Sequence, residues 1–416
     1  MAYNSARVVH DSDSHVLETP TWLRDYADRD VCDKIDPLLY GAEEAVDGDV
    51  ARALERVDAV FDRLRSAHSS SAYRAREAAE IMSRKNFDAT GSFISTDRAR
   101  ALDLLGFSSQ LVFSTFYQTL LHDWEHGKDL DLAYGAARAH NRGLVDFCSA
   151  DPRLLPTCYV PLADIQRAAT TACEAVAMGA AALLVSSGCP AGHSLSHIGL
   201  DRVWAQAEEA STPVVFHVGG SGAVIEDGYF DNGVASAPGF VSPDEAFRSL
   251  AYMGISGPPS MALTALIFDG VLERFPTLRV GVLEHGAVWV PSWMRQMEAA
   301  FDLSDRGVFG PLRVLPALHG NPVSEDRDRL QKLSLRPSEY VQRQVRFAPH
   351  PSEDLAWIIE NAGSDLCMFS LDYPHPEGGC TPVESFEAKL TGISTEIQQQ
   401  FFCDNFLDLM GRQADS

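Results

Sequence analysis

Acidic and imidazole side chains alternate in one short stretch near the start of the chain, Asp11-Ser12-Asp13-Ser14-His15. The stretch follows Arg7-Val8-Val9, a run typical of a buried strand. Because side chains alternate faces along a strand, Asp11, Asp13 and His15 are expected to point the same way. Burying three ionisable groups together is costly unless a metal or a partner charge compensates them, and Asp-x-His offers oxygen and imidazole donors to a metal. The alternative is a loop whose acids are simply solvated.

Further donors accompany four later runs that have the composition of strands. They are His217 in 213–218, Glu284 and His285 after 278–283, His350 after 345–347, and Asp372, His375 and Glu377 after 366–370. A single histidine after a strand is more often a hydrogen-bonded core or loop residue. Donors at the ends of several strands together indicate a metal site.

Eight apolar runs recur along the chain, and a helical pattern follows each one. Runs that are apolar at nearly every position are typical of strands buried on both faces of a parallel sheet. Eight such units predict an α/β fold, a (β/α)8 TIM barrel, with catalytic groups at the carboxyl ends of the strands. A doubly wound open sheet is the alternative. The predicted strands are 7–9, 110–113, 154–160, 182–185, 213–218, 278–283, 345–347 and 366–370.

The 416 residues are interpreted as one barrel domain with insertions at about 20–95, 219–259 and 303–338. The first insertion is rich in helix formers and arginine, so it is expected to be helical. Its basic character suggests that Arg74 and Arg76 bind an anionic group of the substrate, although such runs are more often solvated helix faces. The cluster Gly219-Gly220-Ser221-Gly222 follows the fifth predicted strand, so it is interpreted as a loop and not as a dinucleotide fingerprint.

Charge and composition limit the classes of partner. A formal net charge of −24 argues against nucleic acid, whose phosphates require a basic surface. No apolar run of membrane-spanning length and no secretion signal is evident, so we expect a cytoplasmic protein. The 8 cysteines form no Cys-x-x-Cys pair and are expected to be reduced. A homo-oligomer is compatible with the acidic composition, but nothing in the sequence fixes its order.

The donor pattern resembles the amidohydrolase superfamily, with Asp13-x-His15, His217, His285 and Asp372 on the matching strands. The sequence around these donors, such as Phe216-His217-Val218-Gly219, looks most like that of the decarboxylase branch. This resemblance implies a metal-dependent barrel enzyme that hydrolyses amides or esters, or decarboxylates aromatic acids, with one divalent metal. The chain departs from the pattern at Asp13, which stands where the first histidine of a His-x-His pair is usual.

The local sequence also resembles that of a second group, the TIM-barrel non-haem di-iron monooxygenases of the diterpenoid hydroxylase type. Asp372-Tyr373-Pro374-His375-Pro376-Glu377-Gly378-Gly379 and Trp289-Val290-Pro291-Ser292-Trp293-Met294-Arg295 carry this likeness. It implies that two iron ions activate dioxygen and hydroxylate a hydrophobic, CoA-linked substrate, with an electron donor as a further partner. Aromatic residues of the second insertion, among them Tyr229, Phe230, Phe240, Phe247 and Tyr252, would then receive a polycyclic acyl group.

The supply of donors exceeds what one metal with an open position needs, so the leading prediction is a di-iron monooxygenase. Its expected core ligands are Asp13, His15, His217, Asp372 and His375, with Glu18, Glu284, His285 and Glu377 as further ligands or outer partners. Asp372, His285 and Glu284 are the expected catalytic residues, and Arg74, Arg76 and His350 the expected substrate contacts. The alternative is a hydrolase or decarboxylase with one zinc or manganese ion and Asp372 as general base. A binding protein on a decayed barrel is a third possibility.

Overall fold

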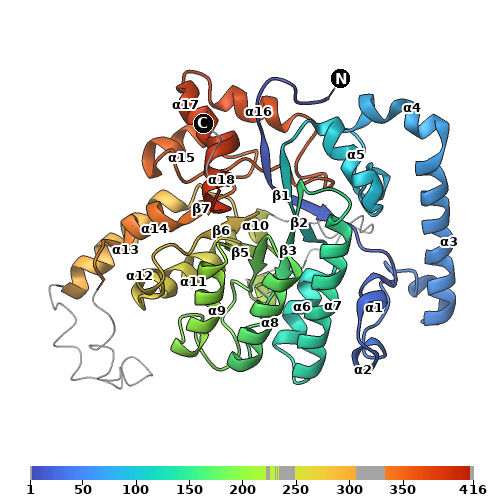
Figure 1. Cartoon of the computed structure of the whole chain (residues 1–416), viewed down its shortest axis with the longest axis horizontal. Helices are drawn as coiled ribbons and strands as arrows, with labels where there is room; N and C mark the ends of the chain where they lie inside the picture. The colour runs from blue at the N-terminus through green and yellow to red at the C-terminus, as the bar shows by residue number, and fades with distance from the viewer. Residues whose placement is uncertain are drawn as a thin grey trace.

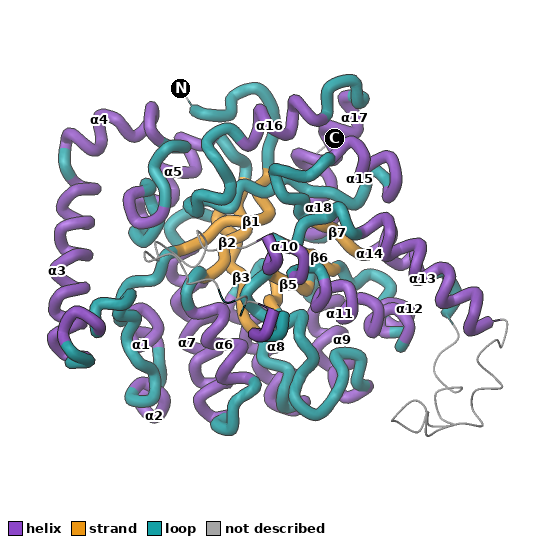
Figure 2. The backbone as a smooth tube through the Cα atoms, turned by 180° about the vertical axis from the view of Figure 1, so that it is seen from behind, coloured by secondary structure: helices purple, strands orange, loops and turns teal. Residues whose placement is uncertain are grey.

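Parallel strands stand side by side at the centre of the computed structural model, and helices surround them (Figure 2). The structure describes residues 2–221, 225–229, 231, 233, 249–305 and 333–412. Neighbouring strands follow chain order and each runs parallel to the next. Nearly every strand residue is buried, as expected for a sheet covered on both faces. The strands are β1 (His10–Val16), β2 (Ser109–Ser114), β3 (Leu154–Tyr159), β4 (Ala182–Leu184), β5 (Val214–His217), β6 (Val280–Leu283) and β7 (Val345–Phe347).

The predicted eighth strand occupies the gap between β7 and β1. The backbone N–H of Met368 donates to Phe347 at 2.8 Å, and the N–H of Ser12 donates to Phe369 at 3.1 Å. Isolated bridges join Phe347 to Cys367 and Ser14 to Tyr373. The ring therefore closes as predicted for a TIM barrel, although the closing segment pairs through bridges and not through a full strand ladder.

The first strand lies further along the chain than predicted. Residues 7–9 precede β1, so Asp13 and His15 lie on the strand itself and not after it. The pairing of β1 with β2 also shifts register between Asp11 and Ser14. This irregularity breaks the simple alternation of faces, and Asp11 faces the backbone of Leu371 and the amide of Gln110.

Helices connect successive strands and cover the outside of the ring (Figure 1). Local signals explain both ends of α8 (Ile165–Met178): Asp164 accepts from the N–H groups of Gln166 and Arg167 at its start, and Gly179 ends it at φ 98°. The barrel helices are α5 (Ser95–Leu105), α6 (Tyr117–Glu125), α7 (Leu130–Cys148), α8 (Ile165–Met178), α9 (Asp201–Glu209), α10 (Ser249–Gly254), α11 (Gly257–Phe268), α12 (Val271–Arg274), α13 (Val290–Asp305), α14 (Pro337–Gln344), α15 (Leu355–Ala362), α16 (Pro382–Lys389), α17 (Thr395–Gln399) and α18 (Asn405–Leu409).

The N-terminal insertion contains α1 (Trp22–Tyr26), α2 (Arg29–Cys32), α3 (Val50–Ser69) and α4 (Ser71–Glu80). Helices α3 and α4 lie at the edge of the molecule, away from the strands (Figure 1). Much of the other two insertions, including Phe230, Phe240 and Phe247, lies outside the described residues.

One described stretch, Leu250–Phe268, is long and apolar enough by composition to cross a membrane. Two of its leucines, Leu263 and Leu266, are buried in the main hydrophobic core. The stretch therefore has the burial of a core helix at these positions.

Candidate metal centre

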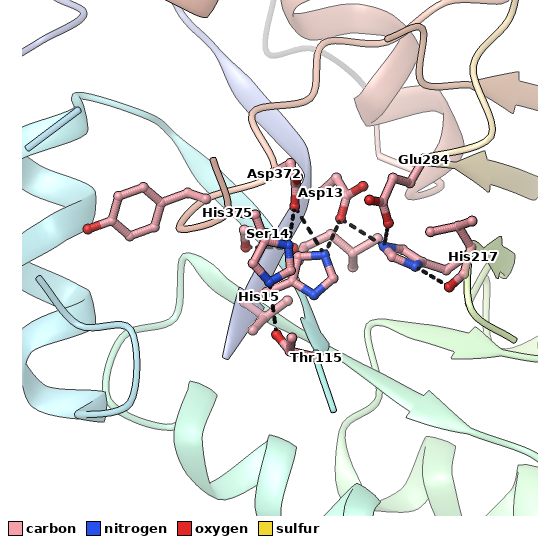
Figure 3. Close-up of polar contacts among 12 residues, drawn as sticks. Asp13, Ser14, His15, Thr115, His217, Glu284, Asp372 and His375 are labelled. Carbon is pink, nitrogen blue, oxygen red and sulfur yellow. Dashed lines mark hydrogen bonds and ion pairs between the residues drawn. The ribbon is translucent and has the colours of Figure 1, made fainter. Parts of the chain in front are cut away.

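The carboxylate of Asp13 lies between two imidazole rings that come from opposite parts of the barrel. Its Oδ1 is 3.2 Å from Nε2 of His15 on β1 and 3.2 Å from Nε2 of His217 at the end of β5. All three side chains are buried, and Figure 3 shows them converging. The strand ends therefore bring together donors that are 204 positions apart in the chain.

Backbone carbonyls orient both imidazole rings. Nδ1 of His15 is 3.1 Å from the carbonyl oxygen of Ser114, and Nδ1 of His217 is 3.0 Å from that of Val218. A carbonyl only accepts, so Nδ1 of His15 carries the proton and its Nε2 presents a lone pair. Metal-binding histidines are commonly held in this way.

Three more donors extend the cluster on either side (Figure 3). Oε2 of Glu284 is 3.3 Å from Nε2 of His217. On the other side, Oδ1 of Asp372 is 3.4 Å from Nε2 of His15 and 2.9 Å from Nδ1 of His375. Ligand atoms within 4.8 Å of one another form two overlapping groups: Asp13, His15, His217 and Glu284, and His15, Asp372 and His375.

Burial and opposite charge act against each other at this cluster. Burial acts to raise the pKa of Asp13, but His217 and His15 outweigh it and hold that pKa well below its usual range. Burial acts to lower the pKa of His217, but Asp13 and Glu284 raise it to about 9. Burial lowers the pKa of His15 to about 3, with His375 acting in the same direction. The carboxylates thus favour positive charge between them, which is the condition for holding a cation.

The donor set fits a divalent metal. Carboxylate oxygens and imidazole nitrogens together suit zinc, manganese or iron and exclude thiolate chemistry. Nε2 of His15 is buried, and its nearest recorded polar neighbours are carboxylate oxygens of Asp13 and Asp372. A metal placed among these atoms would use the lone pair of His15 that no described hydrogen-bond donor satisfies.

The backbone is strained at two of the acids. Glu284 has φ 58° and Asp372 has φ 57°, both in the left-handed region that is unfavourable for residues with a side chain. The N–H of Asp372 donates to the carbonyl of Asp13 at 2.8 Å, which fixes the two acid-bearing segments together. Such strain concentrates at functional sites, where surrounding contacts impose it.

His285 lies beside the cluster but in neither donor group. Its Nδ1 donates to the carbonyl of Ile255 at 2.7 Å, and its buried Nε2 has no hydrogen-bond partner among the described residues. Burial lowers the pKa of His285 to about 4, so the ring is neutral at physiological pH. Because Nδ1 carries the proton, Nε2 presents a lone pair.

A cavity of about 500 Å³ opens next to the cluster. Asp13, Glu284 and Asp372 contribute to its wall together with Glu377. The remaining wall is largely apolar and includes Val218, Tyr252, Met253, Ile255, Ala348, Pro349, Pro351 and Leu371. His350 also faces this cavity, while its Nδ1 is 2.7 Å from the hydroxyl of Ser352.

Several predicted residues do not join the cluster. The carboxylate of Glu18 accepts from the backbone N–H groups of Thr115, Phe116 and Tyr117 at 3.0–3.2 Å, so its oxygens serve the start of α6. Arg74 donates to Asp97 and Glu77 at 2.7 Å, and exposed Arg76 donates to Glu80 at 3.1 Å. These pairings do not present either arginine as a preformed anion site.

Sequence reasoning missed three residues that hold the site. Thr115 Oγ1 is 3.1 Å from Nε2 of His375, and Gln118 Nε2 is 2.9 Å from Nδ1 of His217. Thr115 follows β2, so the same rule about strand ends could have identified it. Glu353 accepts hydrogen bonds from the turn that follows His285, and no spacing in the sequence marks it.

Comparisons with known proteins identify a family by sequence and similar folds by structure. A family model described as amidohydrolase matches residues 96–411. An amidohydrolase of Mycobacterium avium subsp. paratuberculosis K-10 is similar, with 21% identity, a TM-score of 0.68, and coverage of 99% of this chain and 100% of that one. No curated protein shows significant sequence similarity to the chain.

Two similar structures are decarboxylases that contain manganese. One, 5-carboxyvanillate decarboxylase of Novosphingobium aromaticivorans with 4-hydroxy-3-methoxy-5-nitrobenzoic acid, has 16% identity, a TM-score of 0.58, and coverage of 98% of this chain and 96% of that one. The other, dihydroxybenzoic acid decarboxylase of Polaromonas sp. JS666 with 2-nitroresorcinol, has 15% identity, a TM-score of 0.54, and coverage of 97% of each chain.

These comparisons correct the leading prediction. The prediction of a di-iron monooxygenase is wrong, because the family match and the similar structures point to amidohydrolases and decarboxylases. Two iron ions are likewise unsupported, and the expected electron donor and acyl-CoA substrate have no support without the oxygenase. The alternative prediction, an amidohydrolase-type enzyme with a metal site, agrees with the comparisons.

Proposed function

We propose that this chain, which belongs to the amidohydrolase family, is a metal-dependent hydrolase that cleaves an ester or amide bond of a small molecule. The observation that carries the proposal is the cluster of Asp13, His15 and His217, with Asp372 3.4 Å from His15, beside a cavity of about 500 Å³. A cavity of this volume suits a small-molecule substrate, and its apolar wall suits a substrate with a hydrophobic part.

The four converging side chains would hold one divalent metal, with Glu284 and His375 as neighbouring donors. A metal bound there would lower the pKa of a bound water and polarise a substrate carbonyl. Asp372 is the expected general base, because its carboxylate faces both the donor cluster and the cavity. His285 would accept a hydrogen bond through its buried Nε2 and so orient the substrate or the water.

Decarboxylation of an aromatic acid is the second candidate. Manganese-containing decarboxylases align with this chain over 97–98% of its length, which favours this reaction specifically. In this reading the same donors would position a carboxylate and its neighbouring hydroxyl group. The lining residues Tyr252, Ile255 and Val218 would pack against the ring.

The test measures metal content first and turnover second. The purified protein is stripped with a chelator, reloaded separately with manganese and with zinc, and assayed under nitrogen. A panel of p-nitrophenyl esters, anilides and lactones tests hydrolysis, and release of carbon dioxide from hydroxybenzoates tests decarboxylation. About one metal per chain and metal-dependent hydrolysis without oxygen support the proposal. Carbon dioxide release selects the second candidate, and turnover that needs no metal contradicts both.

A further inference from the structure

Glu353 is a buried acid two residues before α15, and both of its carboxylate oxygens accept two hydrogen bonds. Oε2 accepts from the backbone N–H groups of Ala287 at 2.8 Å and His350 at 2.9 Å. Oε1 accepts from the N–H of Val288 at 3.1 Å and the hydroxyl of Tyr252 at 3.3 Å. The side chain is 7% exposed, so these four donors replace water around the carboxylate.

The four donors belong to three separate segments around the cavity. Ala287 and Val288 follow Glu284 and His285 in the turn after β6, His350 follows β7, and Tyr252 lies on α10. Tyr252 and His350 both line the cavity. One carboxylate therefore connects the turn that carries two site residues to two parts of the cavity wall.

Two further contacts make this arrangement tight. A Cβ atom added to Gly286 would lie 2.5 Å from Oε1 of Glu353, so the backbone passes directly over the carboxylate. His285 also donates to Ile255, three residues after Tyr252. His285 and Tyr252 are thus connected twice, once through Ile255 and once through Glu353.

From these contacts we propose that Glu353 is a positioning residue. It fixes the turn that carries Glu284 and His285 relative to Tyr252 in the cavity wall. The proposal rests on the proposed function for its catalytic readout. A carboxylate is required, because glutamine would direct an amide N–H₂ at two of the donors and leave buried N–H groups without an acceptor. Glu353 acts through the turn and does not itself touch the reacting atoms.

The test compares Glu353→Gln with Glu360→Gln, which makes the same chemical change at an exposed position of α15. In Glu353→Gln, amide hydrogen exchange at Ala287, Val288 and His350 should accelerate about tenfold or more. Metal content should equal that of the control, because the metal donors Asp13, His15, His217 and Asp372 do not contact Glu353. The kcat should fall between about tenfold and a hundredfold, because displacement of a positioned group by about 1 Å has that effect.

Tyr252→Phe removes only one of the four donors and leaves the three backbone donors to Glu353 in place. It therefore tests the contribution of the cavity wall separately from that of the turn. It should raise KM several-fold, to roughly the extent of one hydrogen bond. Glu353→Asp, which withdraws the carboxylate by one methylene group, replaces the glutamine variant should that protein fail to fold.

Exchange and kcat in the Glu353 variant that remain within twofold of the Glu360→Gln control overturn the proposal. A loss of metal content equal to the loss of kcat also overturns it, because Glu353 would then support the metal donors. If the wild-type protein has no hydrolase or decarboxylase activity, the proposed function fails. The exchange experiment still decides whether Glu353 holds the turn.

Discussion

Arg98, which is fully buried, donates from Nη1 to the backbone carbonyl of His15 at 3.1 Å. Its Nη2 donates to the carbonyl of Tyr373 at 3.4 Å, and its guanidinium lies 4.9 Å from the centre of the Tyr373 ring. Tyr373 follows Asp372 directly, so one arginine binds the backbone of both the first and the last donor segments. A buried cation is costly unless its partners are fixed, and here the partners are the backbone of the metal centre.

Replacing Arg98 with glutamine should weaken metal binding without removing any donor. Outer partners of metal ligands typically contribute 10-fold to 100-fold in affinity, so we expect a loss of about that size. Competition between the protein and a metal-binding dye measures it. Arg76→Gln, at an exposed position on α4, is the matched control. Equal affinities in the two variants would show that the Arg98 contacts do not support the centre.

Replacing Asp13 with asparagine should remove the stabilisation that metal binding gives to the fold. A ligand at a thousandfold excess over its Kd stabilises a protein by about 4 kcal/mol, which is visible as a rise in Tm. We therefore expect manganese or zinc to raise the Tm of the wild-type protein and of the exposed control Asp103→Asn, but not that of Asp13→Asn. Thermal unfolding with and without metal is the measurement. An equal rise in all three proteins would place the metal elsewhere.

His140 should make stability fall in mild acid. Its Nδ1 is 3.0 Å from Oδ1 of Asn141 and its Nε2 is 3.0 Å from the hydroxyl of Ser114, within the core. Burial lowers the pKa of His140 from 6.5 to about 4. Between these two pH values His140 binds a proton in the unfolded chain but not in the folded chain. The free energy of unfolding therefore falls as pH falls from about 6.5 to 4. The size of this effect is about 3 kcal/mol.

Denaturant unfolding of wild-type protein and His140→Gln between pH 7 and pH 4 isolates this contribution. Other buried histidines contribute to both proteins, so the difference between the two curves reports His140. The variant should lose less stability than the wild type over this interval. Parallel curves would mean that His140 does not titrate differently in the folded and unfolded states.

Gly378 and its neighbour Gly379 should respond very differently to alanine. A Cβ atom on Gly378 would lie 1.8 Å from the carbonyl oxygen of Leu371, whereas a Cβ on Gly379 meets nothing within 4 Å. Gly379 has φ 68°, so Gly379→Ala should cost only about 1 kcal/mol of backbone strain. Gly378→Ala should displace the segment of Asp372 and reduce both Tm and metal content. Similar behaviour of the two variants would contradict the close packing at Gly378.

The barrel and the central donors could be predicted because they follow from strong local patterns. Continuous apolar runs identify buried parallel strands, and His217 and Asp372 stand where such runs end. The closing segment at 366–370 was found by the same pattern, although it joins its neighbours through isolated bridges and separate backbone hydrogen bonds and not through a full strand ladder. The shift in β1 could not be predicted, because the register change near Asp13 depends on its pairing with β2.

The number of metals could not be counted from the acids and histidines in the sequence. Glu18 has the right type and place for a ligand, but backbone N–H groups at the start of α6 occupy its oxygens. Glu353 has an ordinary surface-like sequence context, yet it is buried beneath the turn of His285. The hydrogen-bond donors around a carboxylate come from loops that follow distant strands. The sequence near the carboxylate does not identify those loops.

The ring is joined where the N–H of Asp372 donates to the carbonyl of Asp13 at 2.8 Å and the N–H of His15 donates to that of Tyr373 at 2.7 Å, and His217 and Glu284 come from the chain between these two segments. A growing polypeptide therefore carries an incomplete set of ligands until nearly all of it has been synthesised. Prematurely terminated products that lack the last segment would lack Asp372, His375 and the backbone pairing that closes the ring. The complete donor set therefore forms only after the last segment has paired with β1.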